Sequence, residues 1–197
     1  MNVFYEDLPE TLKINGKEYP IITDFREWIR FSDMLKSDLQ PQYKLEFLAE
    51  MFLEDAPDLY TEEGVEEVMD SITSFLSLEA LELPNQYSDE FAEVEHKDAT
   101  EKKAIYYEQD APYIISAFRR EYQVNLLSVP YMHWWEFRML LDGLSEESQI
   151  KKRIYWRTCD VSKMDKKERM EILKIRRSIT IPEEEYVSDE DIGNAFM

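Results

Sequence analysis

Apolar and polar residues alternate near the start of the chain, in the segment Thr11–Ile22, which reads TLKINGKEYPII. The alternation is interrupted by Asn15 and Gly16, a pair that readily adopts the positive φ angles of a two-residue hairpin turn. The segment therefore predicts a short β-hairpin. Pro20 has no N–H to donate to a neighbouring strand, so we expect its strand to lie at a sheet edge.

The apolar residues then change to a helical spacing in three successive segments. The first is Phe25–Lys36. The second begins at Pro41, a residue favoured in the first turn of a helix, and closes at Ala56 and Pro57. The third begins at Thr61, whose hydroxyl can cap the helix and which is followed by acidic residues in the first turn. The first half of the chain is thus predicted to be a hairpin followed by three helices.

Residues 84–103 differ from the rest, because they are polar, mostly acidic and almost without a period, which is typical of a linker or a long loop. Helical spacing returns beyond them. One helix is predicted to begin near Asp110, and three more helices are predicted at Pro130–Leu144, Ser145–Cys159 and Lys163–Ile179. Between the first two of these, Gln123–Val129 is short and apolar, and it is either a β-strand or a buried connector.

These patterns predict a mostly α protein, with a short N-terminal β-hairpin followed by a multi-helix bundle in two helical halves. The predicted organisation has four parts. They are an N-terminal hairpin with a three-helix acidic region (1–83), an acidic linker or loop (84–103), a C-terminal helical region with an aromatic cluster (104–182) and an acidic tail (183–197).

The chain is strongly acidic, with 23 Lys and Arg against 43 Asp and Glu and a formal net charge of −20. Lys and Arg supply phosphate binding, so this charge argues against nucleic acid as a direct ligand and against anionic membrane surfaces. Of the 197 residues, 44% are hydrophobic and 13% aromatic, which is enough for a core.

The charge is segregated along the chain. Residues 1–110 hold 9 Lys and Arg against 28 Asp and Glu, a net charge of −19, whereas residues 111–182 have a net charge of +5 and residues 183–197 one of −6. One interpretation is that these are solvated faces that happen to segregate. The other is that the two halves attract each other, or that the acidic front meets a partner of opposite potential.

The single cysteine, Cys159, cannot form an internal disulfide, which suits a reducing compartment. The opening MNVFYEDLPE lacks the basic and apolar regions of a signal peptide, and no apolar run approaches the roughly 18 residues of a membrane-spanning helix. We therefore expect a soluble protein of a cytosol.

Catalytic chemistry has little support in the sequence. His96 lies among acidic residues of the linker, where carboxylates are normally only solvated, and His133 lies beside two tryptophans, where packing is its usual role. Cys159 has no identifiable histidine partner. The four glycines are too far apart to form a phosphate-binding loop. We assign no catalytic, cofactor-binding or metal-binding residue, and expect a protein that is not an enzyme.

The densest aromatic cluster, at residues 131–137, is the predicted partner-binding site. Trp134 and Trp135 are adjacent and so point about 100° apart on a helix. Either both belong to the core, or one remains near the surface as an aromatic anchor. Arg138 can add a cation–π contact or an ion pair with the partner. The predicted site residues are Tyr131, Trp134, Trp135 and Arg138.

Three segments of the sequence resemble the bacteriophage gp-fifteen family of tailed phages and prophages. They are LKINGKEYPIITDFREWIRF near the start, DAPYIISAFRREYQVNLL (Asp110–Leu127) and MHWWEFRMLLDGLSEES (Met132–Ser148). The similarity continues through the basic helix near Lys166–Arg177 and covers most of the chain, with residues 84–103 the least characteristic part. The string MHWWEFRxLLDGL is the most specific of these signals.

The resemblance implies a role in building a long non-contractile tail in the host cytoplasm. It suggests a tail assembly chaperone or accessory factor whose protein partner is the tape-measure protein or the major tail protein. The family has no established catalytic residues, so the resemblance assigns none to this chain. We also expect no cofactor. A homo-oligomer is possible, because several copies along one client would add avidity. Two alternatives are a structural virion component of the tail or connector, and an acidic regulatory protein that binds a host factor.

Overall fold

The computed structural model describes residues 1–35, 37–81, 104–162 and 164–179. The predicted linker at 84–103 and the predicted acidic tail at 183–197 lie outside these residues. The described chain divides into two compact units. The N-terminal unit comprises residues 1–81 and Tyr131–Phe137, and the C-terminal unit comprises residues 104–130 and 138–179.

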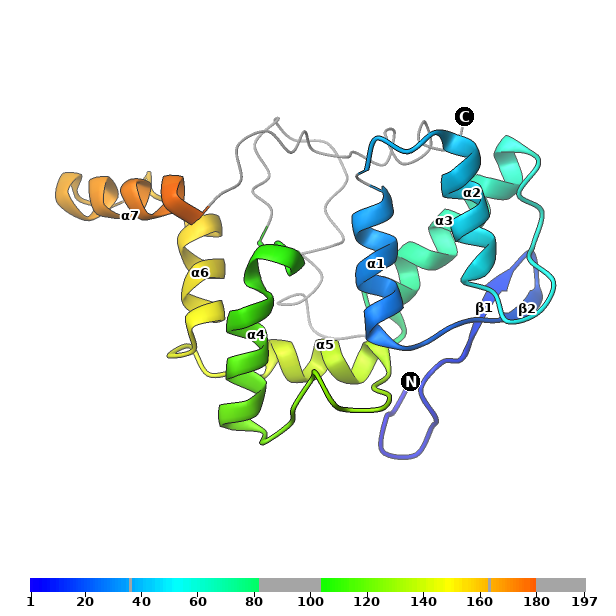
Figure 1. The fold of residues 1–197 in the computed structure, drawn as a ribbon, viewed down its shortest axis with the longest axis horizontal. Helices are drawn as coiled ribbons and strands as arrows, with labels where there is room; N and C mark the ends of the chain where they lie inside the picture. The colour runs from blue at the N-terminus through cyan, green and yellow to red at the C-terminus, as the bar shows by residue number, and fades with distance from the viewer. Residues whose placement is uncertain (36, 82–103, 163, 180–197) are drawn as a thin grey trace. The chain divides into compact units, whose positions relative to one another are not determined.

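The prediction of a mostly α protein with an N-terminal hairpin is confirmed (Figure 1). The N-terminal unit contains β1 (Thr11–Ile14), β2 (Lys17–Pro20), α1 (Phe25–Leu35), α2 (Pro41–Glu50), α3 (Glu62–Leu76), the 3₁₀ turn η1 (Glu79–Leu81) and the first turn of α5 (Trp134–Asp142). The C-terminal unit contains α4 (Tyr107–Glu121), the remainder of α5, α6 (Gln149–Thr158) and α7 (Lys166–Ile179).

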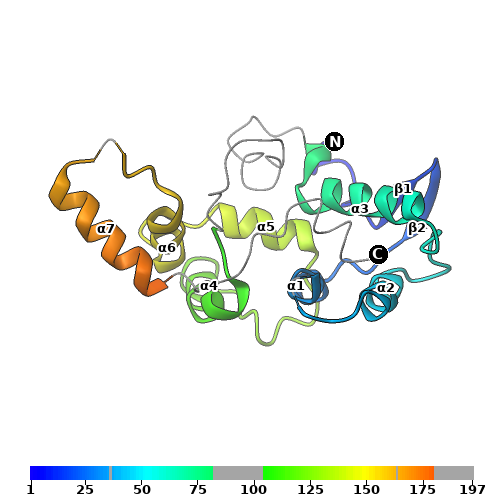
Figure 2. The same cartoon turned by 90° about the horizontal axis from the view of Figure 1, so that it is seen from above.

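The β-hairpin forms where the alternation and the turn residues predict it. Its strands are antiparallel with Thr11 opposite Pro20, and both turn residues have positive φ, 51° at Asn15 and 76° at Gly16. This is the backbone geometry that matches the right-handed twist of the two strands. The hairpin packs on α3, where the Ser71 hydroxyl donates to the Lys13 carbonyl at 3.1 Å (Figure 2).

Aromatic side chains form the centre of the N-terminal unit. Trp28 and Phe31 of α1 are fully buried, and the Trp28 ring lies 4.9 Å from the Phe75 ring of α3. The Trp28 indole N–H donates to the Ile22 carbonyl at 2.8 Å, so the buried polar atom of this side chain is satisfied. Lys44 joins α1 to α2 by donating from Nζ to the Leu35 carbonyl at 2.8 Å, which caps the end of α1.

Helix α2 is shorter than predicted. It ends at Glu50 rather than near Ala56, because the following residues extend the edge of the hairpin region instead of the helix. The Leu53 N–H donates to the Pro20 carbonyl at 2.9 Å, and Phe52 forms an isolated antiparallel bridge with Ile21. These non-local hydrogen bonds replace the ones that a longer helix would make.

The segment Tyr131–Phe137 is grouped with the N-terminal unit, although the sequence-based boundaries placed it in the C-terminal region. The Phe25 N–H donates to the Met132 carbonyl at 3.0 Å, and the Trp134 N–H donates to the Thr23 carbonyl at 2.7 Å. A segment more than 100 residues away therefore completes this unit, and the boundary between the units falls inside α5.

In the C-terminal unit, α6 packs against both α4 and α7 (Figure 2). Ser148 caps α6 by accepting the Lys151 N–H at 3.3 Å, as its place before the helix suggests. Gln123–Val129 matches neither of its two interpretations, because it contains no β-strand and only Leu126 is buried, whereas Leu127 is 74% exposed. None of the described helices is long and apolar enough to cross a membrane.

The first turn of α3 gives a test of the local packing. A glycine in a helix is normally less stable than alanine by about 1 kcal/mol. At Gly64, however, a Cβ atom would collide with the Asp58 carbonyl oxygen and lie 2.9 Å from the Thr61 hydroxyl oxygen. We expect Gly64→Ala to lower the free energy of unfolding by about 1–3 kcal/mol in chemical denaturation. Thr73→Ala, at an exposed position of the same helix, is the control and should not destabilise the protein.

Candidate protein-binding surfaces and a buried charge network

The two adjacent tryptophans of the predicted partner site are both in the core, each with 1% of its surface exposed. Trp135 donates from Nε1 to the Phe75 carbonyl at 2.9 Å, and Trp134 donates to the Leu76 carbonyl at 3.4 Å. These carbonyls belong to the last turn of α3, whose acceptors have no partner within the helix. The two indoles therefore cap α3, and of the two interpretations of this pair the one that places both in the core is confirmed.

The other two predicted site residues differ from each other. Arg138 is 3% exposed and donates to the Tyr107 hydroxyl at 3.4 Å, so it is a buried residue of the C-terminal unit rather than part of an exposed site. Tyr131 is 52% exposed, and its hydroxyl shares a hydrogen bond with the Thr23 hydroxyl at 2.7 Å. Only Tyr131 among the four is accessible to a partner in this conformation.

His133 joins the N-terminal segment to the start of α5. Its Nε2 lies 3.0 Å from the Pro9 carbonyl, and its Nδ1 accepts the Trp135 N–H at 3.0 Å. These contacts require a neutral imidazole with its proton on Nε2. Burial lowers the pKa of His133, and this outweighs the Pro9 hydrogen bond and the nearby Glu10 and Glu136 carboxylates, which raise it. His133 is therefore a packing residue, as its sequence context favoured.

An exposed apolar turn, Val3–Tyr5, is the clearest candidate binding surface that the sequence interpretation missed. Phe4 and Tyr5 are 89% and 86% exposed. The turn is held by Asn2, whose carbonyl accepts the N–H groups of Tyr5 and Glu6 at 3.0 Å and whose side chain accepts the Phe4 N–H at 3.0 Å. The available signal was the string VFY beside the acidic residues EDLPE.

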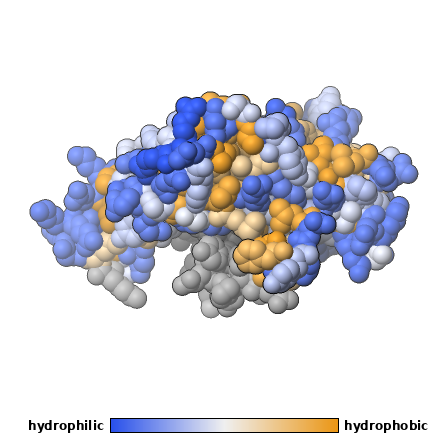
Figure 3. Space-filling view, turned by 90° about the horizontal axis from the view of Figure 1, so that it is seen from below, coloured by the Kyte–Doolittle hydropathy of each residue, from blue (hydrophilic) through white to orange (hydrophobic). Residues whose placement is uncertain are grey.

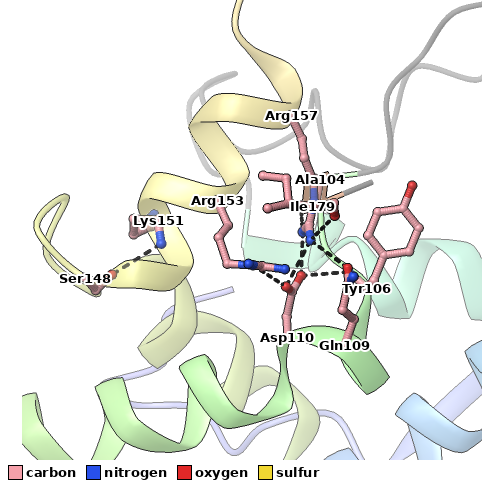
Figure 4. Close-up of polar contacts among 9 residues, drawn as sticks. All are labelled: Ala104, Tyr106, Gln109, Asp110, Ser148, Lys151, Arg153, Arg157 and Ile179. Atoms are coloured by element: carbon pink, nitrogen blue, oxygen red, sulfur yellow. Dashed lines mark hydrogen bonds and ion pairs between the residues drawn. The ribbon is translucent and has the colours of Figure 1, made fainter. Parts of the chain in front are cut away.

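A buried ion network organises the C-terminal unit (Figure 4). Asp110 of α4 is fully buried and lies between two arginines of α6. Arg153 donates from Nε to Asp110 Oδ1 at 2.8 Å, and Arg157 donates to both carboxylate oxygens. The Tyr106 N–H also donates to Asp110, at 3.0 Å. Burial alone raises the pKa of Asp110, but the hydrogen bonds from Arg157, Tyr106 and Arg153 outweigh it, so the pKa lies below its ordinary value.

Arg157 extends this network to the main chain. Its guanidinium donates to the Ala104 carbonyl at 3.0 Å, to the Gln109 side chain at 3.1 Å and to the Ile179 carbonyl at 3.0 Å. Ile179 is the last residue of α7, so Arg157 caps that helix from α6. The ring of Tyr106 lies 4.7 Å from the guanidinium carbon. Every polar atom of this buried cation is satisfied by a structural partner, which indicates a structural rather than a catalytic role.

The sequence offered two further candidates for chemistry, His96 and Cys159. His96 lies outside the described residues. Cys159 is half-buried, and its carbonyl accepts from Arg176 Nη2 at 2.8 Å. Within the described part of the chain, no group of three or more His, Cys, Asp or Glu side chains could hold a metal ion.

The fold and its surfaces define a mostly helical protein built of two units, with an exposed apolar turn in an acidic environment. The chain belongs to a bacteriophage family: the family model described as "Bacteriophage Gp15 protein" matches residues 4–181. This confirms the family suggested by the sequence strings. No curated protein and no solved structure is significantly similar to the chain.

The buried network predicts a large effect of removing one charge. Asp110→Asn would leave Arg153 and Arg157 buried without a counter-charge, so we expect the free energy of unfolding at neutral pH to fall by about 3–5 kcal/mol. Because the pKa of Asp110 is lowered by folding, its contribution is present above the unfolded pKa of about 3.9 and is lost as pH falls below it. Urea denaturation across that range measures both effects. Glu147→Gln, which removes an exposed pair with Lys152, should change little, and an equal effect of the two variants would contradict the assignment.

The lowered pKa of His133 predicts a second loss of stability, at a pH closer to neutral. Its pKa is lower in the folded protein than in the unfolded chain, so the unfolded chain binds the proton first as pH falls below about 6.5. We expect the free energy of unfolding to decrease from pH 7 towards pH 5, and the decrease to be absent in His133→Gln. His96→Gln changes the only other histidine and is the matched control. A decrease that disappears in the control instead would contradict the role of His133.

Proposed function

We propose that this protein is a tail assembly factor that acts in the host cytoplasm by binding the tape-measure protein or the major tail protein. The observation that carries the proposal is the exposed turn Val3–Tyr5 in a chain of a phage family. The role requires binding to another protein, and the turn is a surface exposed for such a contact.

The turn has the properties of an anchor for a protein partner. Phe4 and Tyr5 supply aromatic surface of the kind that is enriched in protein interfaces. The hydrogen bonds from Asn2 hold the backbone before a partner arrives, so less conformational entropy is lost on binding. Apolar residues are also exposed elsewhere, as the orange areas among hydrophilic residues in Figure 3 show.

The net charge of the N-terminal unit supports a role in keeping a client soluble. The described residues of the N-terminal unit contain 20 Asp and Glu against 5 Lys and Arg, a net charge of −15. A unit that binds an apolar helical client through a small aromatic turn would place this charge on the outside of the complex. Like-charge repulsion between such complexes opposes aggregation.

A co-expression experiment tests this proposal. We expect a tape-measure protein from the same phage genome to become soluble when co-expressed with this chain and to co-purify with it. The double substitution Phe4→Ser and Tyr5→Ser should leave the fold intact and weaken the complex by about tenfold or more, because it removes two exposed anchors. Binding is measured by pull-down and by titration of the purified proteins.

Matched controls make the outcome specific. Tyr60→Ser with Leu53→Ser removes a fully exposed tyrosine and a 64% exposed leucine from the same unit, and should leave binding unchanged. Equal losses in the two double variants would show that the turn is not the site. If neither the tape-measure protein nor the major tail protein binds and the chain is found at fixed stoichiometry in purified particles, the protein is a structural virion component instead.

A further inference from the structure

Helix α7 has one packed face and one exposed face. Its packed face lies on α6, where Ile172 and Ile179 are buried and Arg176 donates to the Trp156 carbonyl at 2.7 Å. The opposite face carries an exposed stripe, in which successive residues are 4, 4 and 3 positions apart and so lie in one line along the helix. We call it the basic stripe, and its residues are Lys166, Met170, Lys174 and Arg177.

The cations of the basic stripe do not pair with any acidic side chain among the described residues. Met170, between two of them, is 63% exposed. Lys174 and Arg177 are three positions apart, so they repel each other at the helical spacing where opposite charges would attract. The helix dipole favours Arg177 in the last turn of α7 but disfavours Lys166 in the first turn. A negatively charged partner would stabilise the start of the stripe.

Helix α3 carries a stripe of the opposite sign with the same spacing. Its buried face includes Val65, Val68 and Ile72, and the opposite face is exposed. We call this exposed line the acidic stripe, and its residues, again 4, 4 and 3 positions apart, are Glu62, Glu66, Asp70 and Thr73. Glu62, Glu66 and Asp70 also repel one another at i,i+4 spacing.

We propose that the basic stripe of one copy of this protein docks on the acidic stripe of a second copy. Three acidic side chains on one helix face three basic side chains and one methionine on the other, over equal lengths of helix. The two stripes belong to different units of the chain. The basic and acidic stripes are different surfaces, so the contact either is made twice in a closed dimer or repeats along a row or ring of copies. This inference is independent of the proposed function.

A second copy fits the basic stripe better than nucleic acid does. The chain as a whole has a net charge of −20, which opposes the approach of a polyanion with uniform charge. A second copy also carries this charge, but its acidic stripe presents the complementary pattern at the point of contact. At physiological ionic strength the Debye length is about 8 Å, so distant repulsion is screened more than the contact pairs. We expect a weak association, because the pairs are exposed to solvent.

A charge-swap experiment tests the pairing with the full-length chain. One variant carries Lys166→Glu and Lys174→Glu, and the other carries Glu66→Lys and Asp70→Lys. In sedimentation velocity at physiological ionic strength, we expect wild type to show concentration-dependent association, and either variant alone to associate at least about tenfold more weakly. An equimolar mixture of the two variants should recover the association of wild type, because each altered stripe then meets a complementary one.

The controls separate this contact from general effects of charge. Lys13→Glu with Arg119→Glu changes two exposed residues and the net charge by the same amount as the first variant, and should associate like wild type. Circular dichroism confirms that each variant is folded. Three outcomes would overturn the proposal: a monomeric wild type at every concentration, unchanged association of either stripe variant, or a mixture that fails to recover association. The last would mean that the copies associate without contact between the basic and the acidic stripe.

Discussion

The arrangement of the C-terminal unit depends on the burial of one cation, the guanidinium of Arg157. A buried charge is strongly destabilising unless it is paired and all its donors are satisfied, and here that requires a carboxylate from α4 and carbonyls at Ala104 and Ile179. Replacing such a network by apolar residues is often neutral or stabilising, so its effect is better understood as specificity than as stability. It fixes which end of α7 meets α6, and thereby which face of α7 remains exposed.

The N-terminal unit is completed by a segment distant in the sequence. This explains which of its features the sequence alone predicted and which it did not. The hairpin and the start of α3 follow from local chemistry, at Asn15-Gly16 and at Thr61, and both were predicted. The end of α2 and the burial of both Trp134 and Trp135 depend on pairing with remote backbone groups. Helical periodicity reports which side chains share a face, but not whether a second element covers that face, so three of the four predicted site residues are buried.

The same reasoning explains why the exposed surfaces were found only in three dimensions. A short apolar string at a chain start is equally compatible with a buried strand, and its exposure is decided by the turn that Asn2 holds. The charge segregation was visible in the sequence, but not that α3 and α7 each carry one line of like charges opposite the packed face. Under both proposals the protein separates two tasks, with an aromatic turn for the client and charged stripes for further copies of itself.

Weak contacts suit a factor that must leave when assembly is complete. A row of copies joined through exposed ion pairs would present one aromatic turn per copy along a long client, and the combined binding would exceed that of any single turn. Each contact between copies would still be individually weak and sensitive to competing charge. A permanent virion component would instead be expected to bury a large apolar interface. The exposed aromatic turn is too small for that alone, and the stripes are mainly charged, which agrees with the reversible role proposed here.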